Sequence, residues 1–289
     1  MARLGYVGLG IMGGPMARHL ATAKHSMTVY NRTTAKADAW VEQHGGARAL
    51  TPREVAEASD VVLMCVGNDD DVRSVVFGAD GILAGLKTGG ILVDHTTASA
   101  TIAREIADAC AKQGCGFVDA PVSGGQAGAE NGQLTIMCGS NDPATFDAIE
   151  LIIATYAKRS KLLGTAGSGQ LAKMVNQICI AGVAQGLSEA LNFAMRAGLN
   201  PDDVVDVISK GAAQSWQMEN RGKTMVRNEF EFGFAVEWMR KDLGICFDEA
   251  SRNGAKLPMT EMVDKFYAEV VAMGGKRWDT SSLIARLTD

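Results

Sequence analysis

The sequence lacks the cysteine and histidine patterns on which metal sites, disulfide frameworks and nucleophilic triads are built. Its six cysteines are dispersed, no two of them form a CxxC pair, and no histidine stands at ligand spacing beside any of them. The four histidines are equally scattered. We therefore expect no metal centre and no Ser-His-Asp triad, and we interpret the cysteines as reduced core residues of a cytoplasmic protein.

A basic surface and long apolar runs are also lacking. The 289 residues carry a net charge of −5, and no cluster of Lys and Arg is interleaved with aromatics, which argues against nucleic acid or an anionic membrane as a partner. No secretory signal pattern opens the chain, and no uninterrupted apolar stretch reaches the roughly 18 residues that span a bilayer. With 47% hydrophobic residues, the chain is long enough for two soluble domains with proper cores.

The first informative motif is a glycine-rich turn between an expected strand and an expected helix. The apolar run Leu4–Leu9 leads into Gly8-x-Gly10-x-x-Gly13, and a second apolar strand, Met27–Tyr30, follows at the length of a βαβ unit. In such a turn Gly8 permits the sharp bend, Gly10 lets the backbone approach a pyrophosphate, and Gly13 lets helix and strand pack closely. A purely structural turn is the alternative. We predict dinucleotide binding by Gly8, Leu9, Gly10, Ile11, Met12 and Gly13.

The end of the second strand bears on the choice of cofactor. An NAD-specific protein typically carries Asp or Glu there, about 20 residues past the glycines, to bind the ribose hydroxyls. This chain has Asn31, Arg32 and Thr33 instead. A carboxylate would repel a 2′-phosphate, whereas Asn31 is neutral, Arg32 offers a planar fork of donors and Thr33 a hydroxyl. We therefore predict NADP, with NAD as the alternative cofactor; the competing interpretation of Arg32 is a solvated loop cation.

Further apolar runs predict that a doubly wound sheet continues from the first two strands. They alternate with helical patterns such as Ala100–Lys112 and cover residues 61–66, 91–94, 117–120 and 134–138. Ligands in such sheets bind beyond the carboxyl ends of the strands. We therefore expect ligand contacts from Val66 and from the loops at residues 67–69, 95–97 and 121–125.

The loop at residues 121–125 is the most informative of these. A hydroxyl at Ser123 is followed by two unhindered backbone amides, at Gly124 and Gly125, and together they can form a small anion nest for a carboxylate. A glycine turn between strands is the alternative. The next residues, Gln126–Gly132, are polar and contain glycine, so we expect a loop there.

After Gly164 the strand patterns stop, and the rest of the chain is helical in pattern. We predict a Rossmann-type α/β domain at 1–164 and an all-helical domain at 165–289, with one long interdomain helix over about 166–197. Lys173 lies in the first turns of this mostly apolar helix. If exposed it is a solvated charge, and if partly buried its pKa falls and it can pass a proton near neutral pH.

Taken together, four segments resemble one family, the β-hydroxyacid dehydrogenases, over nearly the whole chain. That family includes 3-hydroxyisobutyrate dehydrogenases, tartronate semialdehyde reductases and glyoxylate/succinic semialdehyde reductases. The segments are Gly8–Gly13 with the following Pro15-Met16-Ala17, Asp119–Gly125, Gly167–Asn176 and Lys241–Gly244. Each alone is modest support, whereas four in order are highly specific.

The resemblance implies a role for each matching residue. Ser123, Gly124 and Gly125 would hold the substrate carboxylate, Lys173 would be the catalytic residue, and Asn176 would orient the substrate. Thr97 is similar to the family's residue near the nicotinamide ribose. Lys241 and Asp242 are similar to its motif pair that closes the cleft, the former assigned to the cofactor and the latter to the substrate; ordinary solvent-facing helix positions are the alternative.

Three positions depart from the family pattern. His19 stands where Asn is common, Thr96 where Ser is common, and Gln177 where a second Asn is common. We expect the first two to be tolerated. Gln177 is longer than Asn and shares the helix face beside Lys173, so it bears on the shape of the active site and on the substrate.

The resulting hypothesis is hydride transfer between NADP(H) and a short carboxylated aldehyde or keto acid, with Lys173 as general acid and base. Two alternatives stay open. Related imine reductases share the scaffold but usually lack a lysine at the position of Lys173, and a non-catalytic NADP-binding sensor would need no intact Ser123, Lys173 and Asn176. The long apolar helix favours a homodimer or homotetramer.

Overall fold

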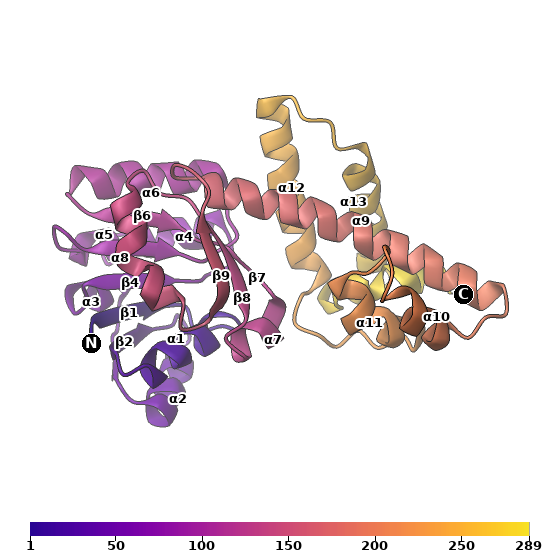
Figure 1. Ribbon diagram of the computed structural model, residues 1–289. Coiled ribbons are helices and arrows are strands. Elements are labelled where there is room, and N and C mark those ends of the chain that lie inside the picture. The colour runs from indigo at the N-terminus through magenta and orange to yellow at the C-terminus, as the bar shows by residue number, and fades with distance from the viewer. Residues whose placement is uncertain (289) are drawn as a thin grey trace. The chain divides into compact units, whose positions relative to one another are not determined.

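The computed structural model describes residues 1–288 and divides into two compact units, Met1–Lys173 and Met174–Asp289 (Figure 1). Unit 1 contains all the named strands within the described residues, and unit 2 is helical. The helix α9, Ser168–Arg196, begins in unit 1 and continues through unit 2. The predicted fold class, a Rossmann-type sheet followed by a helical half with one long helix of about this extent, is confirmed.

Unit 1 is built on a six-stranded parallel sheet with the strand order β3-β2-β1-β4-β5-β6. The chain order reverses at β1, so β1 and β4 lie side by side with Val7 opposite Met64. The strands are β1 (Arg3–Val7), β2 (Ser26–Tyr30), β3 (Ala47–Arg48), β4 (Val61–Met64), β5 (Ile91–Asp94) and β6 (Gly116–Asp119).

Helices cover both faces of this sheet because its strands present apolar side chains alternately to each face. On one face Leu4, Tyr6 and Leu63 pack in a core with α1 (Gly13–Thr22), α2 (Thr34–His44) and α8 (Pro143–Ile153). On the other face Val7, Val62 and Met64 pack in a second core. Its helices are α3 (Pro52–Glu57), α4 (Asp69–Phe77), α5 (Ile82–Gly85) and α6 (Ala100–Lys112).

A second, three-stranded sheet corrects part of the prediction. Residues 134–138 form a strand as predicted, but this strand, β8 (Leu134–Cys138), lies outside the main sheet, between β7 (Val122–Ser123) and β9 (Ala157–Leu162). Its pairing with β7 is antiparallel, which a short connection allows. The expected loop at Gln126–Gly132 is also wrong, because Gly125–Glu130 form the helix α7.

Unit 2 packs its helices around two apolar cores. One core joins α9 to α12 (Val236–Asn253) and α13 (Pro258–Ala272), with Tyr267 fully buried. The other joins α9 to α10 (Pro201–Ile208) and α11 (Trp216–Val226). As predicted from Asn200-Pro201, α10 begins at a proline, with the Asn200 side chain capping it. Two 3₁₀ turns, Gly275–Arg277 and Thr280–Arg286, end the described chain.

The helix α9 is long and apolar enough to cross a membrane by length and composition, with a mean hydropathy of 1.3 over its most apolar window. Core helices pass the same test, and 39% of that window is buried. Leu187 and Leu191 of α9 lie in one core of unit 2, and Ala181 and Ala184 lie in the other. Packing inside unit 2 therefore accounts for part of this apolar character. All six cysteines are free thiols.

Candidate functional site

The glycine turn after β1 has the geometry that the motif predicts. Gly8 adopts a positive φ of 94°, and a Cβ there would overlap the carbonyl oxygen of Cys65. A Cβ at Gly13 would overlap the carbonyl oxygen of Gly8, so the first turn of α1 packs directly on the end of β1. At Gly10, by contrast, an added Cβ would meet nothing within 4 Å. Gly8 and Gly13 are therefore crowded by protein atoms, whereas Gly10 leaves space beside the backbone. A turn that binds a pyrophosphate through its backbone requires this arrangement.

Asn31 fixes the glycine turn to the end of β2. Its Oδ1 accepts a hydrogen bond from the backbone N–H of Leu9 at 2.9 Å, and its Nδ2 donates to the carbonyl of Thr33 at 3.0 Å. Thr33 itself is the residue before α2 and has extended backbone. An amide serves here because it both accepts and donates. The structure thus brings two of the predicted cofactor segments into direct contact.

Arg32 is exposed and forms an ion pair that sequence reasoning missed. Its Nη1 lies 3.0 Å from Oδ1 of Asp71, in the first turn of α4. Asp71 follows β4, the strand two places from β2 in the sheet. The carboxylate that the end of β2 lacks is therefore supplied by α4, the helix that follows β4. Only the sheet order could have signalled this partner.

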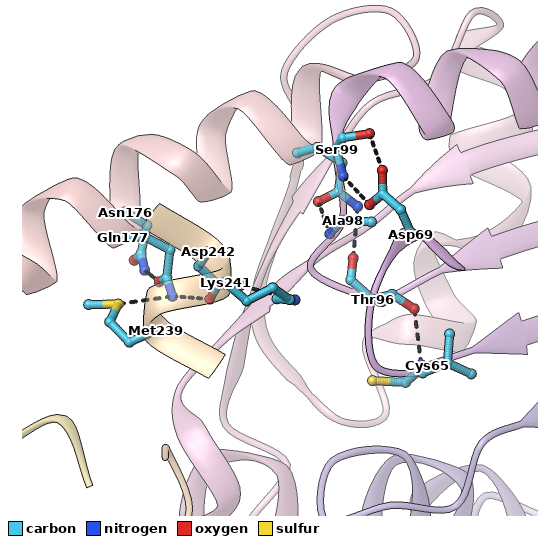
Figure 2. A network of polar contacts seen from close by, with 12 residues as sticks. Cys65, Asp69, Thr96, Ala98, Ser99, Asn176, Gln177, Met239, Lys241 and Asp242 are labelled. Atoms are coloured by element: carbon cyan, nitrogen blue, oxygen red, sulfur yellow. Dashed lines mark hydrogen bonds and ion pairs between the residues drawn. The ribbon is translucent and has the colours of Figure 1, made fainter. Parts of the chain in front are cut away.

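The loop after β5 is tied to the end of β4. Thr96 accepts a hydrogen bond at its Oγ1 from the backbone N–H of Val66 at 3.0 Å (Figure 2). The N–H of Thr96 donates to Asp94 at 2.8 Å. Asp94 is fully buried, and burial raises the pKa of its carboxyl to about 7. Thr97, the predicted cofactor residue, follows in this anchored loop and is half-buried.

His95 beneath this loop is a structural residue. Its Nδ1 lies 2.7 Å from the carbonyl of Ala120 and its Nε2 lies 2.8 Å from the hydroxyl of Tyr156. A carbonyl only accepts, so Nδ1 carries the proton and the tyrosine hydroxyl donates to Nε2. Burial lowers the pKa of His95 to about 4, which keeps the ring neutral. These two hydrogen bonds stabilise the ends of β5 and β6, and we assign His95 no catalytic role.

The segment Ser123-Gly124-Gly125 joins β7 to α7. Gly124 and Gly125 both have positive φ, 135° and 62°, and Gly125 is exposed. Backbone N–H groups in such a bend, followed by a helix start, favour an anion. The predicted carboxylate-binding residues therefore lie together at one accessible bend.

His19 holds α7 in place. Its Nε2 lies 3.0 Å from the carbonyl of Ala129 and 3.1 Å from that of Glu130, at the end of α7, and Arg18 donates to the Glu130 carbonyl at 2.7 Å. The departure from the family's Asn at this position thus supplies a side chain from α1 that reaches the helix after the glycine pair. Sequence spacing gave no sign of this contact.

Lys173 is buried, with 7% of its surface exposed, close to the start of α9. That start is bonded to Asp119, the last residue of β6, whose two carboxylate oxygens accept from the backbone N–H groups of Gly167 and Gln170. The side chain of Gln170 bonds the loop after β5. The exposed-cation alternative for Lys173 is therefore wrong. Asp119 and Gln170 both lie inside the quoted motifs, but their partners are remote in sequence.

In unit 2, four polar side chains form a connected chain. Asn176 donates to Oε1 of Gln177 at 2.8 Å, Gln177 donates to Oδ2 of Asp242 at 2.6 Å, and Lys241 lies 3.0 Å from Oδ1 of Asp242 (Figure 2). Gln177 and Asp242 are 1% and 3% exposed. The alternative of a solvent-facing Asp242 is therefore wrong. The extra methylene of Gln177 gives its amide the reach to a carboxylate on a different helix, α12.

No group of three or more His, Cys, Asp or Glu side chains within residues 1–288 could hold a metal ion. The charged and polar groups that the motifs predicted are instead grouped around backbone bends and helix starts in unit 1 and on two helices in unit 2. Such sites bind organic anions through amides, hydroxyls and ammonium groups.

Comparison with known proteins identifies the family. Residues 3–167 match the NAD binding domain of 6-phosphogluconate dehydrogenase, and residues 167–287 match the NAD-binding domain of NADP-dependent 3-hydroxyisobutyrate dehydrogenase. The chain therefore belongs to the β-hydroxyacid dehydrogenase family, whose members are NAD(P)-dependent oxidoreductases.

Three individual proteins illustrate the likeness. An uncharacterized oxidoreductase of Shewanella frigidimarina is 61% identical over 287 residues, which cover 99% of this chain and 98% of that protein. The 2-hydroxy-3-oxopropionate reductase of Escherichia coli is 34% identical, covering 99% and 97%. The structure of 3-hydroxyisobutyrate dehydrogenase from Mycobacterium tuberculosis with L-serine has a TM-score of 0.89 at 28% identity and covers 100% of both chains.

Proposed function

We propose that the protein transfers hydride between NADP(H) and the carbonyl of a short carboxylated aldehyde or keto acid, giving a 2- or 3-hydroxy acid. Membership of the family supports an NAD(P)-dependent oxidoreductase. The observation that carries the proposal further is the buried ammonium of Lys173, on a helix whose start is bonded to the ends of β5 and β6. The segments that follow these strands contain Thr97 and Ser123.

The remaining roles in the proposal follow the motifs. Residues 1–164 bind the cofactor, and residues 165–289 form the helical half. Ser123, Gly124 and Gly125 bind the substrate carboxylate, and Asn176 and Asp242 orient the substrate. The cofactor is bound by the glycine turn and by six further residues, namely Asn31, Arg32, Thr33, Val66, Thr97 and Lys241.

The chemistry divides between cofactor and protein. The nicotinamide, when bound, supplies or takes the hydride. In reduction, Lys173 Nζ gives a proton to the carbonyl oxygen as that oxygen becomes a hydroxyl; in oxidation, Nζ takes the proton back. The positive charge of the ammonium stabilises the developing oxyanion, and burial strengthens this interaction because water screens it less.

The residues around the glycine turn fit a dinucleotide, since Gly10 leaves open space where the backbone approaches a pyrophosphate. NADP is proposed over NAD because the end of β2 offers a guanidinium and no carboxylate. The ion pair of Arg32 with Asp71 tempers this preference, because a 2′-phosphate must compete with that carboxylate for the guanidinium. NAD remains the alternative cofactor.

Replacement of Lys173 tests the proposal. Lys173→Ala should lower the turnover rate by a factor on the order of 10² or more while NADPH affinity stays nearly unchanged, because the lysine acts on the substrate oxygen. Turnover is followed at 340 nm with glyoxylate, succinic semialdehyde, methylmalonate semialdehyde and tartronate semialdehyde. The exposed Lys158 provides a matched control, and Lys158→Ala should keep full activity. A Lys173→Ala variant with wild-type turnover would refute the assignment.

The same assay separates an enzyme from a sensor. A sensor would bind NADPH tightly, as measured by cofactor fluorescence, and would turn over none of the four substrates. Turnover of any of them by the wild-type protein rules out a purely sensory role.

We also propose a cytoplasmic homodimer or homotetramer. The exposed side of α9 within unit 2 supports this proposal, since it carries Val175, Cys179, Val183 and Phe193, with Val175 62% and Phe193 73% exposed. Apolar side chains repeated along one side of a long helix favour association with another apolar surface. Light scattering coupled to size-exclusion chromatography measures the assembly directly, and a mass of one chain would exclude it.

A further inference from the structure

The first turn of α9 is capped by a residue that is remote in sequence. Asp119, at the end of β6, is fully buried. Its Oδ1 accepts from the N–H of Gly167 at 2.7 Å, and its Oδ2 accepts from the N–H of Gln170 at 2.9 Å. Both oxygens of one carboxylate thus satisfy backbone donors that every helix start leaves without an intrahelical partner. The cap fixes the start of α9 to the main sheet of unit 1.

Other helices of unit 1 have local caps. Thr51, Asn68, Ser99 and Asp142 each stand directly before the helix that they cap, namely α3, α4, α6 and α8. A local cap stabilises its own helix but leaves the position of that helix to packing. A cap from a strand end also sets where the helix lies. The long-range cap of α9 therefore has a positional consequence that these four local caps lack.

Gln170 holds the same turn to a second strand end. The side chain is 1% exposed; its Oε1 accepts from the N–H of Ala98 at 3.0 Å, and its Nε2 donates to the carbonyl of Thr96 at 2.8 Å. Both partners lie in the loop that follows β5 and contains Thr97. All four hydrogen bonds are buried, where a donor or acceptor left without a partner is destabilising. The turn is therefore tied to β5 and β6 at once.

We propose that Asp119 and Gln170 are positioning residues for Lys173. Lys173 follows Gln170 by three residues, less than one helical turn. A shift of the capped turn would move the ammonium by a similar distance relative to Thr97 and Ser123. The inference rests on the proposed role of Lys173 as proton donor and acceptor. It adds that kcat depends on the buried hydrogen bonds of Asp119 and Gln170.

A double-mutant cycle tests the inference in the full-length protein. Asp119→Asn alone should lower kcat by about tenfold or more at saturating NADPH, because small misplacements of reacting groups are costly, while the KM for NADPH stays within about twofold. In a Lys173→Ala background the same substitution should cause no further loss of kcat, because residues that act as a unit are non-additive. Additive losses would overturn the inference.

Two further variants keep the test decisive. Gln170→Leu serves if Asp119→Asn does not fold, and the same non-additivity with Lys173→Ala is expected. Asp142→Asn is the matched control, since Asp142 caps α8 in the same unit. We expect a small loss in melting temperature, while kcat stays within about twofold of the wild-type value. If neither Asp119→Asn nor Gln170→Leu lowers kcat, the inference is overturned.

The cycle also separates this inference from the proposed function. If Lys173→Ala alone retains wild-type turnover, the proposed function fails. If Lys173→Ala is slow and the Asp119 effect is additive with it, the proposed function stands and only the positioning role fails.

Discussion

The two units hold their candidate site residues in different ways. In unit 1 the groups are mostly backbone amides and loop side chains at the ends of parallel strands, held by bonds such as Leu9 to Asn31 and Val66 to Thr96. In unit 2 they are side chains on the helices α9 and α12, linked to one another through Gln177 and Asp242. Unit 1 therefore depends on backbone geometry, whereas unit 2 depends on the reach of individual side chains.

The glycine turn is where the dependence of unit 1 on backbone geometry should show the largest effect. Gly8→Ala places a Cβ against the Cys65 carbonyl at a positive φ, so we expect a loss of roughly 2–4 kcal/mol in the free energy of unfolding and loss of NADPH binding. Gly10→Ala is the matched variant. It should keep the melting temperature and lower only the NADPH affinity, since its Cβ meets no protein atom within 4 Å.

Chemical denaturation and cofactor titration measure the two quantities separately. Equal stability losses in Gly8→Ala and Gly10→Ala would contradict the distinction between a crowded and an open glycine. Unchanged NADPH affinity in Gly10→Ala would contradict the assignment of that open space to the cofactor.

Gln177 is the corresponding test in unit 2. Gln177→Leu removes the amide that donates to the buried Asp242, and we expect the free energy of unfolding to fall by about 1–3 kcal/mol because a buried carboxylate oxygen loses its partner. Gln185→Leu on the same helix is the control. Gln185 is also buried, but its amide bonds the exposed Glu189 and its Oε1 has no hydrogen-bond partner among the described residues. Its replacement leaves no buried partner unpaired, so the free energy of unfolding should fall by no more than about 0.5 kcal/mol. If both variants lose a similar free energy of unfolding, the hydrogen bond from Gln177 to Asp242 does not account for the loss.

Buried carboxyl groups at the strand ends of unit 1 should make stability depend on pH. Burial raises the pKa of Asp94 to about 7 and that of Asp119 to about 6, from an ordinary value of 3.8. Between about pH 4 and 7 the folded protein holds protons that the unfolded chain releases, so stability should fall as the pH rises through this window. Melting temperatures from pH 5 to 8 measure the slope, which Asp94→Asn should reduce. A slope unchanged in that variant would contradict the role of Asp94.

The smallest expected effect is at the surface pair of Arg32 and Asp71. Asp71→Asn frees the guanidinium and removes a negative charge from its side, so NADPH affinity should rise by a few-fold while NADH affinity changes little. Exposed ion pairs contribute only about 0–1 kcal/mol, so the melting temperature should barely move. Equal changes for both cofactors in competition titrations would show that Asp71 does not contribute to discrimination of the 2′-phosphate.

Much of unit 1 could be predicted because its signals are local. The run Leu4–Leu9, the glycine spacing and the helix at Ala100–Lys112 each depend on residues close in sequence, and β5 and α6 occupy the predicted residues. The separate sheet of β7, β8 and β9 could not be predicted, because an apolar pattern indicates a strand but does not indicate which other strand it pairs with. The helix α7 was missed because two of its six residues are glycines, Gly125 and Gly128, which lower helix propensity, and because contacts from His19 and Arg18 hold it.

The sequence by itself determined the family, five of the six strands of the main sheet, and which residues belong to the motifs. Turn chemistry and apolar periodicity depend on residues that are neighbours in the chain. Tertiary structure decided what surrounds those residues. It buried Lys173, brought Asp119 to the start of α9 from 48 residues earlier, paired Arg32 with Asp71 and turned the departure at Gln177 into a bond with Asp242. Burial and the partner of a polar group depend on segments remote in the chain, and no local pattern records them.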